Sequence, residues 1–112
     1  MNSEHNLGEF EQLVLLAILR LQPDDAYGVT IRAEIAAHTA RSPAPGAIYT
    51  TLERLERKGF AVSRAGDPTP QRGGRQKRLF EVTAAGVRAL QRARREYENL
   101  ARGLDVLQGG NA

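Results

Sequence analysis

The chain has 112 residues, a net charge of +3 and no cysteine. Its length fits one domain with a modest core, and the lack of cysteine excludes a disulfide framework or a thiolate metal site. No apolar run approaches the roughly 20 residues that span a bilayer, and the polar N-terminus lacks the pattern of a secretory signal, so we expect a soluble cytoplasmic protein with no membrane partner.

The first expected element is a helix from about Glu9 to Leu21. Its apolar residues follow i, i+3, i+4 spacing, which is typical of a core-facing helix: Phe10, Leu13, Val14, Ala17, Ile18 and Leu21. Leu15, Leu16 and Leu19 fall outside that stripe, so the helix is apolar nearly all round. In so small a domain a second copy of the chain would cover the surplus, and these three leucines are the first candidates for a dimer interface.

A second helix is expected from Ala26 to about His38, after a break that holds Asp24 and Asp25 as available N-caps. Its core positions recur every four residues: Tyr27, Ile31 and Ile35. A turn over residues 39–44 then leads to another helix, so these elements form a helix-turn-helix pair.

The helix expected over residues 45–58 has two different sides. Ile48, Leu52 and Leu55 form the buried stripe. The opposite side is small, hydroxylated or charged: Gly46, Thr50, Glu53, Arg54 and Arg57. Pro45 suits the first helical position and Gly59 the helix end. A DNA major groove admits a helix with such a face, although an ordinary surface helix has the same pattern.

Several residues of this helix are candidates for DNA contact. Gly46 and Ala47 would let the helix N-terminus approach phosphate, or they simply start the helix. Thr50 can meet a base edge or a thymine methyl. Tyr49 lies beside the core stripe, so it either packs there or reaches phosphate with its hydroxyl. Arg54 can hold guanine or phosphate, or instead pair with a carboxylate on the protein.

A hairpin is expected next, from residues 60–64 and 76–82, with Phe80 and Val82 on its inner face. The Pro- and Gly-rich residues 65–75 cannot be helical. Residues 41–78 hold nine Arg or Lys against three Asp or Glu, so this region suits a polyanion. The candidates for backbone or minor-groove contact, which hold register more than they read sequence, are Arg72, Arg75 and Lys77. Arg78 is set aside because it alternates to the other strand face. A helix followed by a hairpin with a basic tip indicates a winged helix-turn-helix.

A last helix is expected from Thr83, whose hydroxyl suits an N-cap. Its apolar residues recur at alternating steps of three and four, as in a coiled-coil seam: Leu90, Ala93, Tyr97, Leu100, Leu104 and Leu107. We interpret this seam as a dimer interface, the alternative being a helix packed on its own domain. Gly103 lies inside it and would weaken the helix by up to ~1 kcal/mol. The expected fold is mainly α (α+β): a winged helix-turn-helix DNA-binding domain over residues 1–82 and a C-terminal dimerisation helix over 83–112, in one compact unit.

Enzymatic activity is not expected. No phosphate-cradling Gly loop, nucleophile–base set or carboxylate pair occurs at usable spacing. His5 and His38 lack partners at metal spacing, so we expect no metal and no cofactor. The alternative to a DNA-binding regulator is a winged-helix protein-interaction module without DNA binding, which the basic hairpin and the Thr50 and Arg54 side chains argue against.

Five ordered blocks carry a family resemblance: residues 7–19, 26–28 with Ile31, 46–59, then Gly74, Arg75, Lys77 and Phe80, then 83–86. Over residues 7–107 the chain resembles PadR-type transcriptional regulators, and the single short C-terminal helix is similar to their small subgroup. The resemblance implies a homodimeric repressor that binds a palindromic operator in double-stranded DNA and dimerises through its first and last helices. It also implies a small apolar or aromatic effector between the subunits. Prolines in residues 67–72 and 41–45 depart from the family pattern and leave the shape of the wing and the start of the recognition helix open.

Overall fold

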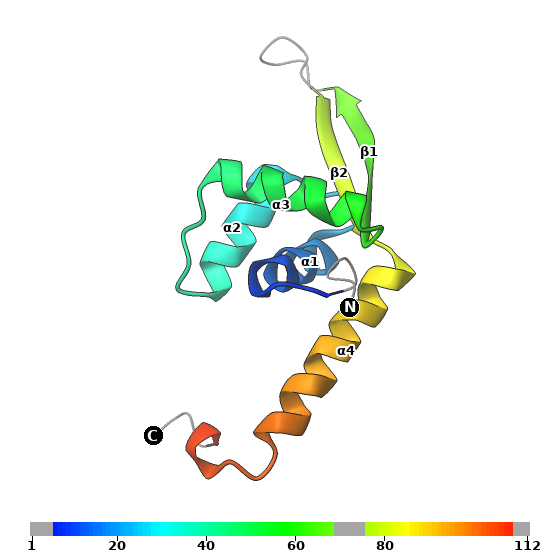
Figure 1. Ribbon diagram of the computed structural model, residues 1–112. Coiled ribbons are helices and arrows are strands. Elements are labelled where there is room, and N and C mark those ends of the chain that lie inside the picture. The colour runs from blue at the N-terminus through cyan, green and yellow to red at the C-terminus, as the bar shows by residue number, and fades with distance from the viewer. Residues whose placement is uncertain (1–5, 69–75, 109–112) are drawn as a thin grey trace.

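The computed structural model describes residues 6–68 and 76–108. Its elements are α1 (Glu9–Leu21), α2 (Gly28–His38), α3 (Pro45–Arg57), β1 (Ala61–Pro68), β2 (Gln76–Val82), α4 (Ala84–Ala101) and the 3-10 turn η3 (Asp105–Leu107). Helices α1, α2 and α3 form one body, the β1–β2 hairpin projects from it, and α4 runs away in the opposite direction (Figure 1). This arrangement confirms the predicted winged helix-turn-helix with a two-stranded antiparallel sheet and a C-terminal helix.

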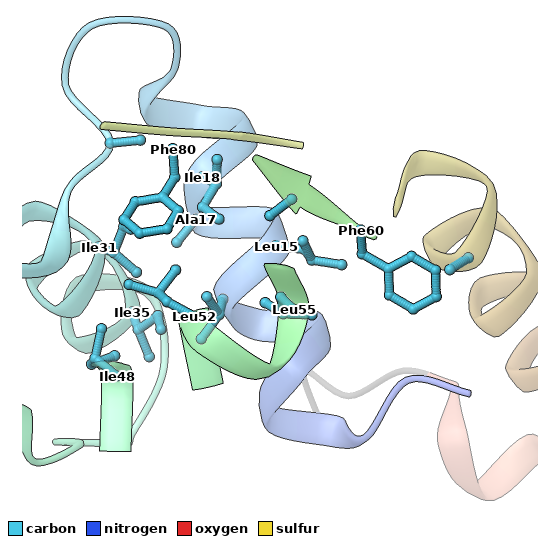
Figure 2. Close-up of a cluster of buried hydrophobic side chains, with 14 residues drawn as sticks. Leu15, Ala17, Ile18, Ile31, Ile35, Ile48, Leu52, Leu55, Phe60 and Phe80 are labelled. Carbon is cyan, nitrogen blue, oxygen red and sulfur yellow. The ribbon is translucent and has the colours of Figure 1, made fainter. Parts of the chain in front are cut away.

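The core lies where α1, α2 and α3 meet, and it is closed by Phe60, just before β1, and by Phe80 of β2 (Figure 2). The stripe predicted for α3 is confirmed, because Ile48 and Leu55 are fully buried and Leu52 is 1% exposed. Burying one such side chain contributes about 1.5–3 kcal/mol. The three α3 residues therefore determine how this helix is rotated about its own axis.

The prediction that Leu15 belongs to an outer surface of α1 was wrong. Leu15 is fully buried in the core of its own chain, whereas Leu16 is 47% exposed and Leu19 is 37% exposed. Helix α1 packs against α2, α3, β2 and α4, so it buries a wider arc than its periodic stripe. Phe10 and Leu13 lie at the margin of that arc and are only partly buried.

The start of α2 also differs from the prediction. Tyr27 is the N-cap residue, and its amide donates to the Thr30 hydroxyl at 3.0 Å. Asp24 instead accepts a hydrogen bond from Arg64 Nη2 at 3.0 Å, and Asp25 offers its backbone carbonyl to the Thr30 hydroxyl. Neither aspartate side chain caps the helix, because both residues lie before the N-cap position, Tyr27.

The hairpin is longer than predicted. Strand β1 continues to Pro68, with Ala65 opposite Arg78, a shift in register, and Pro68 opposite Gln76. Gly and Pro exclude a helix, but they permit a strand. Proline has no amide hydrogen, so it fits at a strand position where the pairing requires no donated hydrogen bond. Gly66 is covered by Leu79, since a Cβ at Gly66 would lie 3.1 Å from Leu79 Cδ1. Strand β1 is therefore paired beyond residue 64, where the sequence predicted that it ends.

Helix α4 begins as predicted and ends earlier. Thr83 caps it by accepting a hydrogen bond from the Gly86 amide at 3.0 Å. Gly103 then adopts a φ of +81°, and the helix has already ended at Ala101. The predicted continuous seam is therefore wrong beyond Leu100, since Leu104 and Leu107 follow the break. Within the described ranges, no helix has the length and apolar character that crossing a membrane requires.

One buried ion pair joins the first turn of α1 to the end of α3. Glu11 is 4% exposed, and its two carboxylate oxygens lie 3.0 and 2.9 Å from Lys58 Nζ. The Gly8 amide also donates to Glu11 Oε1 at 2.7 Å. A buried carboxylate is tolerated only when charges and hydrogen bonds compensate it, so these contacts hold the two helix ends together.

Replacing Lys58 with methionine should lower the free energy of unfolding by about 3 kcal/mol, because the Glu11 carboxylate stays buried after it loses its cation. Arg94→Met is the matched control, since the Arg94–Glu98 pair is exposed on α4 and such pairs contribute only about 0.3–0.5 kcal/mol. Urea denaturation measures both variants. Equal loss from the two substitutions would show that the buried pair is not a structural tie.

Candidate nucleic-acid interface

The face of α3 opposite the core is open to solvent. Gly46, Thr50 and Arg57 are all exposed, and they lie on the side of the helix away from Ile48, Leu52 and Leu55. A Cβ built on Gly46 would meet no atom within 4 Å. Packing inside this chain therefore does not require a glycine there, whereas close approach of another molecule would.

The N-terminus of α3 suits an anion. The first turn holds no acidic residue, Pro45 occupies the start, and Ala44 is the N-cap residue without a side-chain cap. The Ala47 and Ile48 amides both donate to the Ala44 carbonyl, at 3.0 and 3.3 Å. The Gly46 amide has no acceptor among the described residues, and a free amide at the positive end of a helix dipole can donate to phosphate.

The two arginines of α3 lie in different surroundings. Arg54 leans toward α1, where its Nη1 is 3.9 Å from Glu11 Oε2 and its side chain is 43% exposed. This geometry supports the alternative of an ion pair on the protein. Arg57 is exposed and forms no ion pair within residues 6–68 and 76–108. The sequence analysis placed Arg57 on the outer face but did not select it as a DNA contact. Its spacing supports that role, because Arg57 lies two helical turns after Thr50 on the same face.

Tyr49 is not a core residue. It is 52% exposed, and its ring covers the start of α2, where a Cβ at Gly28 would lie 2.5 Å from the Tyr49 hydroxyl oxygen. A cleft of 570 Å³ opens between α2, α3 and β2, and Tyr49, Glu53 and Lys77 are among its lining residues. The structure thus places one candidate from α3 and one from the wing in the same cleft.

The wing is fastened to the helical body through its side chains. Lys77 is exposed, and its Nζ lies 4.5 Å from the centroid of the Tyr27 ring, which is a cation–π contact. Arg78 donates to the Ser63 hydroxyl at 2.9 Å, and that hydroxyl donates to Glu56 of α3 at 2.6 Å. Arg78 is thereby engaged within the protein. Arg72 and Arg75 lie outside the described residues.

Two further sets of exposed apolar side chains occur outside the wing, one on α4 and one on α1. Tyr97 and Leu100 on α4 are 66% and 83% exposed, and Leu16 and Leu19 on α1 are also exposed. Leu90, by contrast, packs against the core of its own chain. Figure 1 shows α4 leaving the three-helix body, so its second half finds no apolar cover there. The dimer interface predicted from the sequence would bury these exposed apolar groups.

The histidines do not form a metal site in the described parts of the chain. His38 Nε2 lies 3.0 Å from Glu34 Oε2 on the surface, and His5 falls outside the described residues. The search of residues 6–68 and 76–108 finds no group of three or more His, Cys, Asp or Glu side chains that could hold a metal ion.

A model of the transcriptional regulator PadR-like family matches residues 15–92. The chain belongs to the PadR family. It is 39% identical over 105 residues to Transcriptional regulator Rv3488 of Mycobacterium tuberculosis, and the match covers 90% of each chain.

Solved structures share the fold at low identity. A PadR family transcription regulator from hypervirulent Clostridium difficile is 19% identical with a TM-score of 0.68, and the match covers 89% of this chain and 99% of that chain. A PadR-like transcriptional regulator from Bacillus cereus is 18% identical with a TM-score of 0.68, covering 89% of this chain and 92% of that chain. The family model and the 39% identical relative show that the protein is a transcriptional regulator and not an enzyme, as the sequence predicted.

The two arginines of α3 should differ in their effect on DNA binding. Arg57→Ala should weaken binding and flatten the dependence of log affinity on log salt by about one unit, as the loss of one phosphate contact does. Arg54→Ala should change that slope less, because Glu11 already engages Arg54. Fluorescence anisotropy across a salt series measures both variants. A larger loss of slope for Arg54→Ala than for Arg57→Ala would contradict the assignment.

Proposed function

We propose that the protein is a homodimeric repressor that binds a palindromic operator, with α3 in the major groove and the wing along the backbone. The observation that carries this proposal is the exposure of Gly46, Thr50 and Arg57 on the α3 face that the core leaves free. In this proposal residues 1–82 bind DNA and residues 83–112 join the two copies.

Each candidate contact has a distinct part. Thr50, midway along the outer face of α3, meets base edges and so contributes to sequence choice. Gly46 and Ala47 bring the helix amides to phosphate, and Tyr49 reaches the backbone at the rim of the cleft that it shares with Lys77. Arg72, Arg75 and Lys77 hold the wing on the backbone, which sets register without reading sequence.

Dimerisation uses the exposed apolar surface on α1 and α4. Leu16 and Leu19 supply the α1 part, and the C-terminal part consists of Tyr97, Leu100, Leu104 and Leu107, each at least 46% exposed. Two copies related by a two-fold axis would present two α3 helices, and such a pair matches a palindromic site. An effector between the copies remains a prediction from the family resemblance.

Selection of bound fragments from the genome of the source organism tests this function. Purified protein should enrich a small set of fragments that share a palindrome, with half-sites about 10–10.5 bp apart or a multiple of that spacing. No enrichment at low ionic strength would favour the protein-interaction module instead.

Thr50 and Lys77 should affect specific and non-specific binding differently. Lys77→Ala should weaken binding to operator and to random duplex by the same factor, and should reduce the salt slope by roughly one unit. Thr50→Ala should weaken binding to the operator alone, by about 1 kcal/mol, because it removes a base contact. Arg95→Ala on α4 is the control and should change neither affinity. Equal effects of Thr50→Ala on operator and random DNA would remove Thr50 from base reading.

The apolar surface of α4 should hold the dimer together. The unaltered protein should sediment at twice the 12.3 kDa mass of the chain, and Leu100→Lys should shift it toward the single chain because a charge enters an apolar contact. Val62→Lys is the matched control, since Val62 is 55% exposed on the wing opposite Glu81. Sedimentation at micromolar concentration decides between these outcomes, and a single-chain species for the unaltered protein would contradict the proposed dimer.

A further inference from the structure

An apolar groove runs between α1 and α2, and it shares no lining residue with the 570 Å³ cleft beside Lys77 (the wing cleft). It has a volume of 390 Å³, and no residue of α4 or η3 lines it. Its apolar lining consists of Leu13, Leu16, Ala17, Leu19 and Ile35. Leu16 and Leu19 belong both to this groove and to the proposed dimer interface, so the groove continues that surface.

Arg20 lies at the rim of the groove, and part of its guanidinium is free to donate further hydrogen bonds. Arg20 Nε lies 2.6 Å from Glu34 Oε2, and His38 Nε2 lies 3.0 Å from the same oxygen. The hydrogen bond from Arg20 holds the pKa of the Glu34 carboxyl below its usual range. The Arg20 side chain is 59% exposed, and a guanidinium has further N–H donors beyond Nε. Another carboxylate can therefore bind at the Arg20 end of the groove.

The chain after α4 forms a small apolar turn. Gly103, at a φ of +81°, turns the backbone after the helix. Two hydrogen bonds then close η3, from the Leu107 amide to the Leu104 carbonyl at 3.1 Å and from the Gln108 amide to the Asp105 carbonyl at 3.0 Å. Leu104, Val106 and Leu107 are 46%, 88% and 53% exposed, and Asp105 lies among them.

We propose that residues 104–107 of each protomer dock in the α1–α2 groove of its partner, with the three apolar side chains on the groove lining and Asp105 against Arg20. This inference rests on the proposed homodimer and names a surface within it. A second copy is the fitting occupant because apolar groups meet apolar groups and a carboxylate meets a guanidinium. Helix α4 carries the segment away from its own three-helix body, as Figure 1 shows, and a two-fold axis would form the contact twice.

The docking has a consequence for DNA recognition. Helix α2 packs against both α1 and α3. A segment bound between α1 and α2 would therefore contact the helices that hold the recognition helix α3 in place. The preformed turn needs little further ordering when it binds, which lowers the cost of association. The docked segments, residues 104–107 of each copy, would thereby fix the separation of the two α3 helices.

Disulfide cross-linking tests the docking, because the chain has no cysteine of its own. Val106→Cys combined with Leu19→Cys should give a covalent dimer on mild oxidation, seen on a non-reducing gel. The matched control combines Val106→Cys with Val29→Cys, since Val29 is 64% exposed on α2 and lines the wing cleft instead of the groove. The control pair and each single variant should stay uncrosslinked.

Sedimentation of the same variants before oxidation separates two failures. A reduced protein that sediments as a dimer but gives no cross-link between positions 106 and 19 overturns the docking and leaves the homodimer standing. A reduced protein that sediments as a single chain contradicts the proposed homodimer itself. A disulfide formed within one chain would show that the segment fills its own groove, and it would also overturn the inference.

A charge exchange tests the Asp105–Arg20 contact separately. Asp105→Arg should weaken dimerisation by roughly tenfold, because two arginines then meet. Adding Arg20→Asp should restore most of the affinity, a rescue that general destabilisation would not give. Glu96→Arg, an exposed acid on α4, is the control and should change dimerisation less. Absence of rescue in the double variant would remove this ion pair from the proposal.

Discussion

The burial of the α3 apolar stripe fixes both the three-helix body and the orientation of the outer face of α3. Ile48, Leu52 and Leu55 are buried against α1, α2 and the strands. A helix that buries one side presents the opposite side, so the same contacts that stabilise the fold also aim Thr50 outward. The Glu11–Lys58 pair secures the far end of α3 to α1. Stability and the direction of the recognition face therefore have one cause.

The proposed dimer would cover the apolar groups that this small core leaves exposed. Helix α4 leaves the body after its first turns, and α1 keeps leucines on its outer side. A second copy would cover both surfaces, and it would place two recognition faces on one duplex. Because α1 packs directly against α3, a contact between two copies through α1 would also affect the geometry of DNA binding.

Local patterns in the sequence predicted the elements well, and long-range contacts account for the errors. Periodicity identified α1 and α3, and the hydroxyl of Thr83 identified the start of α4. The burial of Leu15 depends on how many neighbours surround α1, which spacing within one helix does not report. Arg54 turns toward Glu11, a carboxylate that also binds a lysine 47 residues along the chain. The end of α4 could have been predicted from Gly103, because a glycine that weakens a helix can also end it.

An amide NMR titration with the operator duplex reports which face of the protein meets DNA. We expect the largest chemical-shift changes at the start and outer face of α3, around Gly46, Thr50 and Arg57, together with changes along the wing. The amides of the second half of α4 should hardly move. Shift changes concentrated on α4, with α3 unaffected, would contradict the claim that core packing aims α3 at DNA.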